Sequence, residues 1–314
     1  MIQNMIASNS GQSGTGAVIT RLDVSRNGVY GAPDGVDGYS PVYVNVPTGS
    51  IHMGADDDEI KMLVFITEET RQPWVNYIQS VANDVTVDWG DGTTPSTDSR
   101  TGTSRTTCAG VSHTYVSYGL KVITLTKHSG TLSLLESNGF LSFAGAYSTT
   151  NGNAYPNNGK YRNSLIQVHI GYNCTVSSLS SCLSLQDIKR WSPILTDGIG
   201  FAQNNLLRAE LIDGDIYCPS FTSNSRIETV TIPSSITTIP VNCFRTCSNL
   251  RYVDFTAIEL ENGALPITFG TNVFTSTSAS LVLMFATAEI AAVAKETTNL
   301  TEYSSKIHSL DEEE

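Results

Sequence analysis

Apolar and polar residues alternate along three runs in the first half of the chain. The runs are Met62–Ile66, Val85–Trp89 and Leu120–Leu125, and they are separated by stretches rich in glycine, aspartate, serine and threonine. Alternation with a period of two is typical of β-strands that have one buried face. Short strands divided by turn residues predict an antiparallel β-sandwich over residues 51–130.

A longer period governs the second half of the chain. From position 163 onward a unit of the form L-x-x-V-x-I recurs, and its first residues are 20, 21, 21 and 23 positions apart. One unit cannot bury its apolar face alone, so the units must stack. The pattern predicts a leucine-rich-repeat β-solenoid over residues 163–314, ending in a cap with a helix at 289–296. The first residues of the units are Leu165, Leu185, Leu206, Ile227 and Leu250.

Two segments lie outside these patterns. Residues 1–50 begin as a glycine- and serine-rich arm and continue as two short strands around turn residues, which predicts a hairpin. Residues 131–162 are rich in Gly, Ser, Thr, Asn and Tyr and are interpreted as a linker or long surface loop. The predicted fold is therefore mainly β, with an N-terminal hairpin arm, a β-sandwich and a β-solenoid with a C-terminal cap.

Charge and hydropathy narrow the range of partners. The 314-residue chain has a formal net charge of -12, and only 15% of its residues are charged. Without a basic segment it cannot neutralise a phosphate backbone, so we expect no nucleic-acid partner. The longest apolar run, residues 279–294, contains polar residues and is too short to span a bilayer. The N-terminus lacks the pattern of a secretory signal, so we expect neither membrane insertion nor secretion.

Motifs for catalysis are scarce. The six cysteines lack zinc-site spacing, which favours reduced, buried thiols, and the five histidines are scattered. The nucleophile elbow, the phosphate loop and the zinc-protease and dinucleotide motifs are missing, although abundant serines leave a Ser-His-Asp arrangement in space open. Asp213 and Asp215 are candidates for a glycosidase pair, but Gly214 between them more simply indicates a turn. We expect a non-enzymatic protein with no cofactor and no metal.

Residues 27–46 read Asn-Gly-Val-Tyr-Gly-Ala-Pro-Asp-Gly-Val-Asp-Gly-Tyr-Ser-Pro-Val-Tyr-Val-Asn-Val. This segment resembles a short repeat common in structural proteins of phages and prophages, and it departs from that repeat mainly at Gly31, where Thr or Asp is usual. The alternative is a generic hairpin with two Asp-Gly turns. The resemblance implies a virion component that is anchored through its N-terminal hairpin, with anchoring residues Tyr30, Pro33, Tyr39, Pro41, Val42 and Val44.

Two short motifs in residues 51–130 resemble the Ig-like polycystic-kidney-disease (PKD) domain. The first ends a predicted strand with a Trp-Gly-Asp-Gly turn, and the second is a His-Thr-Tyr sequence before a glycine-led strand. The resemblance implies structural roles, with a buried tryptophan, glycines at positive φ and carboxylates that cap the turn. The alternative is a metal or acid-base site. The motif residues are Asp88, Trp89, Gly90, Asp91, Gly92, His113 and Tyr115.

Residues 227–250 resemble the BspA-like class of leucine-rich repeat, in which each unit carries an Ile-Pro-Ser-Ser turn and a later Phe and Cys. Pro240 is the departure, because the family usually has Gly there. The earlier units are degenerate and are identified by spacing more than by their residues.

Together these features predict a phage virion surface protein, such as a head fibre, a capsid decoration protein or a tail protein. Its N-terminus would anchor to capsid or tail proteins, and an Ig-like spacer would project the repeats toward a host receptor or glycan. We expect a homo-oligomer, for example a trimer, made in the host cytoplasm and located on the virion surface. Alternatives are a bacterial surface adhesin and a polysaccharide-cleaving enzyme. Exposed aromatic contacts to a partner are expected from Tyr147, Tyr155 and Tyr161 in the linker.

Overall fold

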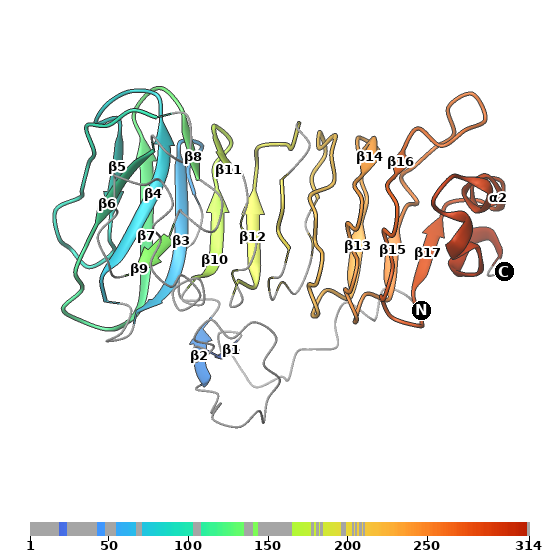
Figure 1. Ribbon diagram of the computed structural model, residues 1–314, viewed down its shortest axis with the longest axis horizontal. Coiled ribbons are helices and arrows are strands. Elements are labelled where there is room, and N and C mark those ends of the chain that lie inside the picture. The colour runs from blue at the N-terminus through green and yellow to red at the C-terminus, as the bar shows by residue number, and fades with distance from the viewer. Residues whose placement is uncertain are drawn as a thin grey trace.

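The computed structural model confirms that the chain is mainly β, with several sheets and one short α-helix among the residues that it describes. Those residues form an elongated body with antiparallel sheets at one end and the helix at the other (Figure 1). They are residues 19–23, 43–47, 55–66, 71–102, 108–134, 141–143, 165–176, 179, 182, 185–195, 199–202, 204, 206, 209 and 211–312.

The N-terminal segment contains the two strands that the sequence predicts. Strand β1 (Ile19–Asp23) pairs antiparallel with β2 (Tyr43–Pro47), and their register runs from Ile19 opposite Pro47 to Asp23 opposite Tyr43. The strand pair is confirmed. The residues between the two strands, which hold most of the phage-like segment, lie outside the described part of the chain.

The first large sheet has five strands, and the predicted alternation of buried and exposed residues holds only in part. The alternation holds in β5, where Val85 and Val87 are fully buried while Asp88 is exposed, but not in β3, where Met62, Leu63 and Val64 are buried in succession. The sheet is antiparallel except for its last pair. In spatial order its strands are β5 (Val85–Asp88), β7 (Gly119–Lys127), β3 (Glu59–Ile66), β10 (Leu165–Ile170) and β12 (Asp187–Arg190).

A second sheet lies beside the first and shares its apolar core. Its central strand is β4 (Pro73–Gln79), which pairs antiparallel with β6 (Ala109–Ser112) and β8 (Leu132–Leu134). Strand β8 also pairs parallel with β11 (Cys174–Val176). The two sheets are visible together in Figure 1.

The structure corrects part of the linker prediction for residues 131–162. Strand β8 and strand β9 (Leu141–Phe143) lie within that segment, and both pair with β4. Each of them hydrogen-bonds to a different half of β4, so three residues are enough to form each strand. The remaining residues of the predicted linker, 135–140 and 144–162, lie outside the described part.

Strand β10 joins the antiparallel part of the molecule to a parallel part. On one side it pairs antiparallel with β3, where Ile170 faces Ile60 and a register shift occurs between Leu165 and Gln167. On the other side it pairs parallel with β12, where Ile170 faces Arg190. Strand β10 is therefore shared between the antiparallel part and the parallel part.

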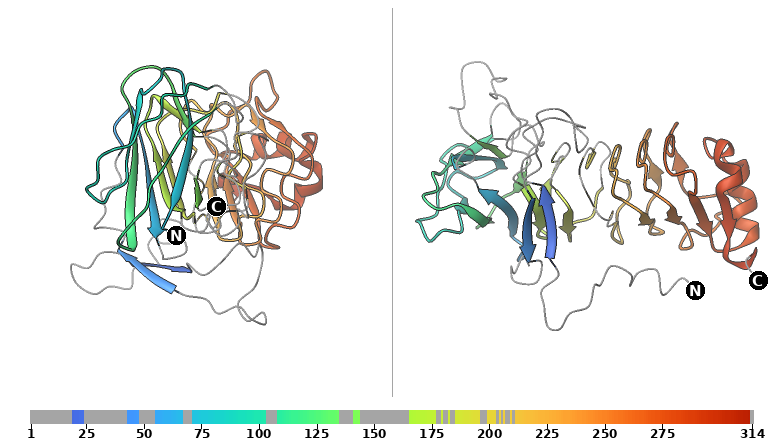
Figure 2. Two further views of the ribbon diagram at one scale, coloured as in Figure 1. Left: turned by 60° about the vertical axis from the view of Figure 1, so that its left-hand side comes forward. Right: turned by 90° about the horizontal axis from the view of Figure 1, so that it is seen from below.

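Beyond β12 the chain forms a series of short parallel strands. Strands β13 (Thr229–Thr231), β15 (Tyr252–Asp254), β17 (Val282–Phe285) and β18 (Ile307–Ser309) make a four-stranded parallel sheet. Strands β14 (Thr238–Ile239) and β16 (Thr268–Phe269) form a second parallel pair. Seen from below, these strands lie one after another along the long axis (Figure 2).

The register of these strands matches the predicted repeat. Val168 pairs with Ile188, Ala209 bridges to Val230, and Val230, Val253, Leu283 and Ile307 follow in one continuous row. Val168, Ile188, Ala209, Val230 and Val253 are the central positions of the predicted units, whereas Leu283 and Ile307 lie in the predicted cap, and all seven residues are buried. The described strands of this part therefore pair in parallel through a row of buried apolar residues.

Aromatic rings stack inside this parallel part. The rings of Phe221 and Phe244 lie 5.7 Å apart and nearly parallel, as do those of Phe244 and Phe274. Phe201 extends the row at one end, and Tyr303 closes it edge-on at 5.4 Å from Phe274. The five rings lie 20 to 30 residues apart along the chain, so this aromatic spine couples neighbouring segments through their interior.

The C-terminal helix is where the sequence predicts it. Helix α2 (Ala288–Glu296) begins at Thr287, whose Oγ1 accepts a hydrogen bond from the Ile290 N–H at 3.3 Å. Its buried side, which includes Ile290, Ala291 and Ala294, lies at the end of the strand series beside β17 and β18. The short helices η2 (Thr301–Lys306) and η3 (Leu310–Glu312) complete this end.

Candidate functional site

The Trp-Gly-Asp-Gly and His-Thr-Tyr motifs form one cluster between the two large sheets. Trp89 follows β5 and is 1% exposed, and its indole stacks on the His113 ring at 5.1 Å. The Tyr115 hydroxyl donates a hydrogen bond to the Trp89 carbonyl at 2.6 Å, and the Trp89 Nε1–H donates to Ser96 Oγ at 2.9 Å. The residues that the resemblance groups together are in contact.

Both carboxylates of this motif stabilise its turn. Asp88 Oδ1 accepts a hydrogen bond from the Gly90 N–H at 2.8 Å, and Asp91 Oδ1 accepts bonds from the Thr93 N–H and hydroxyl. Gly90 has φ of +72°, and a Cβ there would lie 2.3 Å from the Val122 carbonyl oxygen. Only glycine fits at this position.

His113 and Asp91 contact each other within the same cluster. His113 Nε2 lies 2.7 Å from Asp91 Oδ2, and the two side chains are 15% and 8% exposed. Burial opposes ionisation of Asp91, but hydrogen bonds from Thr93 and His113 outweigh it, so the pKa of Asp91 lies below its ordinary value. The imidazole and the carboxylate are thus bound to each other, and Trp89 covers one face of the imidazole.

The lowered pKa of Asp91 gives the protein a defined response to acid. Because the pKa is lower in the folded state, ionised Asp91 stabilises the fold at pH above about 3.9, the ordinary aspartate value, and this contribution is lost as pH falls through the folded pKa. We expect an Asp91→Asn variant to be less stable than the wild type at pH 7, with the difference shrinking below pH 4. Urea unfolding at pH 7 and pH 3 measures this difference, and a difference equal at both values would contradict the assignment.

Asp213 and Asp215, the candidate glycosidase pair, differ in burial and in hydrogen bonding. Asp215 is fully buried and receives two guanidinium hydrogen bonds from Arg190, one of them to Oδ1 at 2.6 Å. Its oxygens also accept hydrogen bonds from the Ile194 and Ile212 N–H groups at 2.7 and 2.9 Å. Asp213 is exposed in the turn that precedes it. The buried carboxylate is committed to structure, which agrees with the interpretation of Gly214 as a turn residue.

The cysteines are placed as structural groups. All six are buried, none is in a disulfide, and Cys218 Sγ lies 3.5 Å from Cys243 Sγ. Burial raises the pKa of the Cys174 and Cys247 thiols to about 12, which keeps both protonated and poorly nucleophilic at neutral pH.

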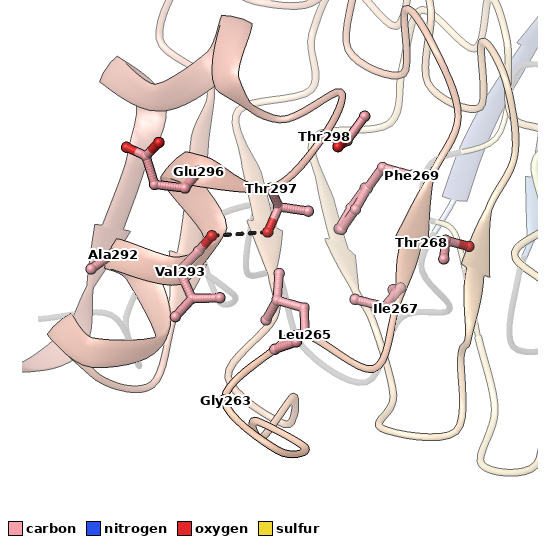
Figure 3. Close-up of a pocket in the computed structure, with 11 residues that line it drawn as sticks. Gly263, Leu265, Ile267, Thr268, Phe269, Ala292, Val293, Glu296, Thr297 and Thr298 are labelled. Carbon is pink, nitrogen blue, oxygen red and sulfur yellow. Dashed lines mark hydrogen bonds between the residues drawn. The ribbon is translucent and has the colours of Figure 1, made fainter.

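A pocket of about 800 Å³ opens at the C-terminal end, between α2 and the loop that precedes β16. In Figure 3 the side chains of Leu265, Ile267 and Phe269 face Val293 across it, and Thr297 Oγ1 donates to the Val293 carbonyl at 2.9 Å. Glu296 is the one titratable residue among the lining residues. The pocket therefore offers apolar contact without a paired acid and base.

The outward side of β10 and β12 carries a polar group that sequence reasoning missed. Asp187 and Lys189 alternate along β12, and Trp191 follows directly with 44% of its surface exposed. His169 on β10 lies beside Lys189 in register, and its ring meets the Trp191 indole edge-on at 6.1 Å. The signal that reveals it is alternation within a repeat unit: Ile188 and Arg190 are buried, so Asp187, Lys189 and Trp191 share the outer side.

Most of the predicted anchoring and partner-binding residues fall outside the described part of the chain. The exception is Val44, which lies in β2 opposite Leu22. The others are Tyr30, Pro33, Tyr39, Pro41, Val42, Tyr147, Tyr155 and Tyr161.

Over the described ranges, no three His, Cys, Asp or Glu side chains are grouped as metal ligands. The helices of the described segments are all too short or too polar to cross a membrane. No protein-family model matches the sequence, and a comparison with curated proteins finds no significant relative.

Proposed function

We propose that this chain is a surface protein of a phage virion, anchored by residues 1–50 and projecting its repeats toward the host cell. The observation that carries the proposal is the resemblance of residues 27–46 to the repeat of phage structural proteins. The antiparallel strands β1 and β2, whose pairing includes Leu22 opposite Val44, flank and overlap that segment. A short strand pair of this kind is marginal alone, so it is suited to docking on a larger assembly.

In this proposal, the two parts of the chain that follow residues 1–50 have different roles. Residues 51–130 are an Ig-like, PKD-type domain, supported by the Trp89, His113 and Tyr115 cluster and by the two sheets around one core. Residues 163–314 are a leucine-rich-repeat solenoid, supported by the row of stacked apolar positions and by the aromatic spine. Stacked repeats present an extended surface, which is a common platform for recognition.

The anchoring role is tested by removing residues 1–50. We expect the truncated chain to fold, because β1 and β2 pair only with each other among the described strands, and to be missing from purified particles. The readout is the amount of chain that co-sediments with particles when full-length or truncated protein is supplied to cells producing them. A truncated chain that keeps far-UV circular dichroism but still joins particles at the full-length level would sink the anchoring role.

A bacterial surface adhesin is the second candidate, because the Ig-like and BspA-like resemblances apply equally to such proteins. Fractionation separates the two. The virion proposal places the chain with particles, whereas an adhesin would remain with the cell envelope after particle release.

A further inference from the structure

Strand β12 and the residue after it carry an acidic, a basic and an aromatic side chain in a line. Asp187, Lys189 and Trp191 occupy alternate positions on its outer side, while Ile188 and Arg190, 8% and 5% exposed, face the interior. Alternate residues of a strand are about 6.6 Å apart, so the Cα atoms of the three residues span about 13 Å. The Trp191 N–H donates to the Ile170 carbonyl at 3.3 Å, which keeps this residue in register with β10.

Strand β10 supports this line from one side. Gln167 lies beside Asp187 and His169 beside Lys189. His169 is only 7% exposed, its Nε2 is 3.9 Å from Asp187 Oδ2, and its Nδ1 has no hydrogen-bond partner in the described part of the chain. Because the buried His169 ring meets the Trp191 ring edge-on, it fixes one side of the indole and leaves the rest of the indole surface to solvent.

Charge on this surface is balanced rather than basic. Lys61 on β3 lies opposite His169, and its Nζ is 3.1 Å from Glu59 Oε2. Two ammonium groups and two carboxylates thus lie around His169 on neighbouring strands. A phosphate or carboxylate ligand accepts hydrogen bonds only and would be repelled by Asp187, whereas a hydroxyl both donates and accepts.

The geometry points to a saccharide site on this surface, and we propose that its ligand is a neutral hexopyranose within a cell-surface glycan. The apolar C–H face of the sugar lies on the Trp191 indole, and neighbouring hydroxyls donate to Asp187 and accept from Lys189. Binding sites usually fix the orientation of a ligand with a small number of polar groups placed beside aromatic side chains. The neighbouring strands carry other residues at the outer positions: Thr229 and Thr231 on β13, and Tyr252 and Asp254 on β15.

This inference rests on the proposed attachment function, because it names the ligand class of the projecting repeats. It is tested with the full chain on an array of neutral oligosaccharides built from hexoses and N-acetylhexosamines, together with their uronic-acid, sialylated and phosphorylated counterparts. We expect binding to neutral members, accompanied by a change in tryptophan emission. A Trp191→Ala variant should bind about tenfold more weakly or worse, because truncating a central aromatic contact removes most of its contribution.

Two further variants separate the roles within the site. Asp187→Asn and Lys189→Met should each weaken binding while leaving the thermal midpoint near that of the wild type. Tyr118→Ala is the matched control, since Tyr118 is an aromatic residue of 50% exposure in the turn before β7, and its binding should be unchanged. Equal binding by the wild type and Trp191→Ala, a preference for anionic members, or no saccharide binding by the full chain would each overturn the inference.

Failure of the inference and failure of the attachment function give different results in a competition assay. Purified full chain that blocks particle adsorption to host cells, and blocks it equally well as Trp191→Ala, leaves the function standing and removes the saccharide site. A wild-type chain that neither blocks adsorption nor occurs in particles removes the function itself.

Discussion

An Asp215→Ala variant is expected to lose about 3–5 kcal/mol of unfolding free energy, because it leaves the Arg190 guanidinium buried without its counter-charge. Arg190 and Asp215 are 5% and 0% exposed, and the carboxylate also holds the Ile194 and Ile212 N–H groups. The substitution therefore removes one partner of a salt bridge and the acceptor of two backbone donors at once. Chemical denaturation monitored by circular dichroism measures the loss.

The chain supplies a matched control two residues away. Asp213 is an exposed carboxylate of the same turn, and Asp213→Ala should change stability by no more than about 0.5 kcal/mol. A double variant that replaces Arg190 by Met and Asp215 by Leu should recover much of the loss, since it removes both charges together. A loss of under 1 kcal/mol in Asp215→Ala would show that the pair is solvated in solution.

A Phe244→Ala variant is the second large effect, with an expected loss of about 3–5 kcal/mol. Phe244 is fully buried and stacks on both Phe221 and Phe274, so its removal opens a cavity in the middle of the aromatic spine. Because Phe244 contacts rings on both sides of it, the loss should also lower hydrogen-exchange protection in the strands that precede and follow it in the chain, β13 and β15.

Arg245→Ala tests whether the effect belongs to the ring. Arg245 is the exposed neighbour of Phe244, and its truncation should leave the denaturation midpoint nearly unchanged. Phe244→Leu should lie between the two, because leucine fills part of the space but cannot stack. Equal midpoints for Phe244→Ala and the wild type would contradict a continuous spine.

The mainly β character of the second half could be predicted from sequence because apolar residues recur there at regular spacing. Val230 and Val253 hold the same position of the L-x-x-V-x-I unit, and the structure pairs them in adjacent parallel strands. Strands β8 and β9 could not be predicted in the same way. Each has three residues, too few to show a period, and both depend on the edges of β4, which lies more than 50 positions earlier in the chain.

The candidate sites also differ in how far they could be predicted from sequence. The resemblance predicts a buried Trp89, glycines at positive φ and carboxylates that cap the turn, and the structure shows all three. The partnership of Arg190 with Asp215 was not, because the two residues belong to successive units and nothing in their spacing distinguishes a buried pair from two surface charges. The line of Asp187, Lys189 and Trp191 was missed because its unit is the most degenerate of the series.

The position of β10 determines how stiff the molecule is. Five of its residues are paired with β3, and two further backbone hydrogen bonds, from Gly171 to Glu59 and from Asn173 to Asp57, extend that contact at 2.8 Å each. A flexible tether between the two halves would let each turn freely, whereas this junction resists both bending and torsion. The described part of the chain therefore moves as one rigid body. When the antiparallel end is held in one direction, helix α2 and the strands beside it also point in a fixed direction.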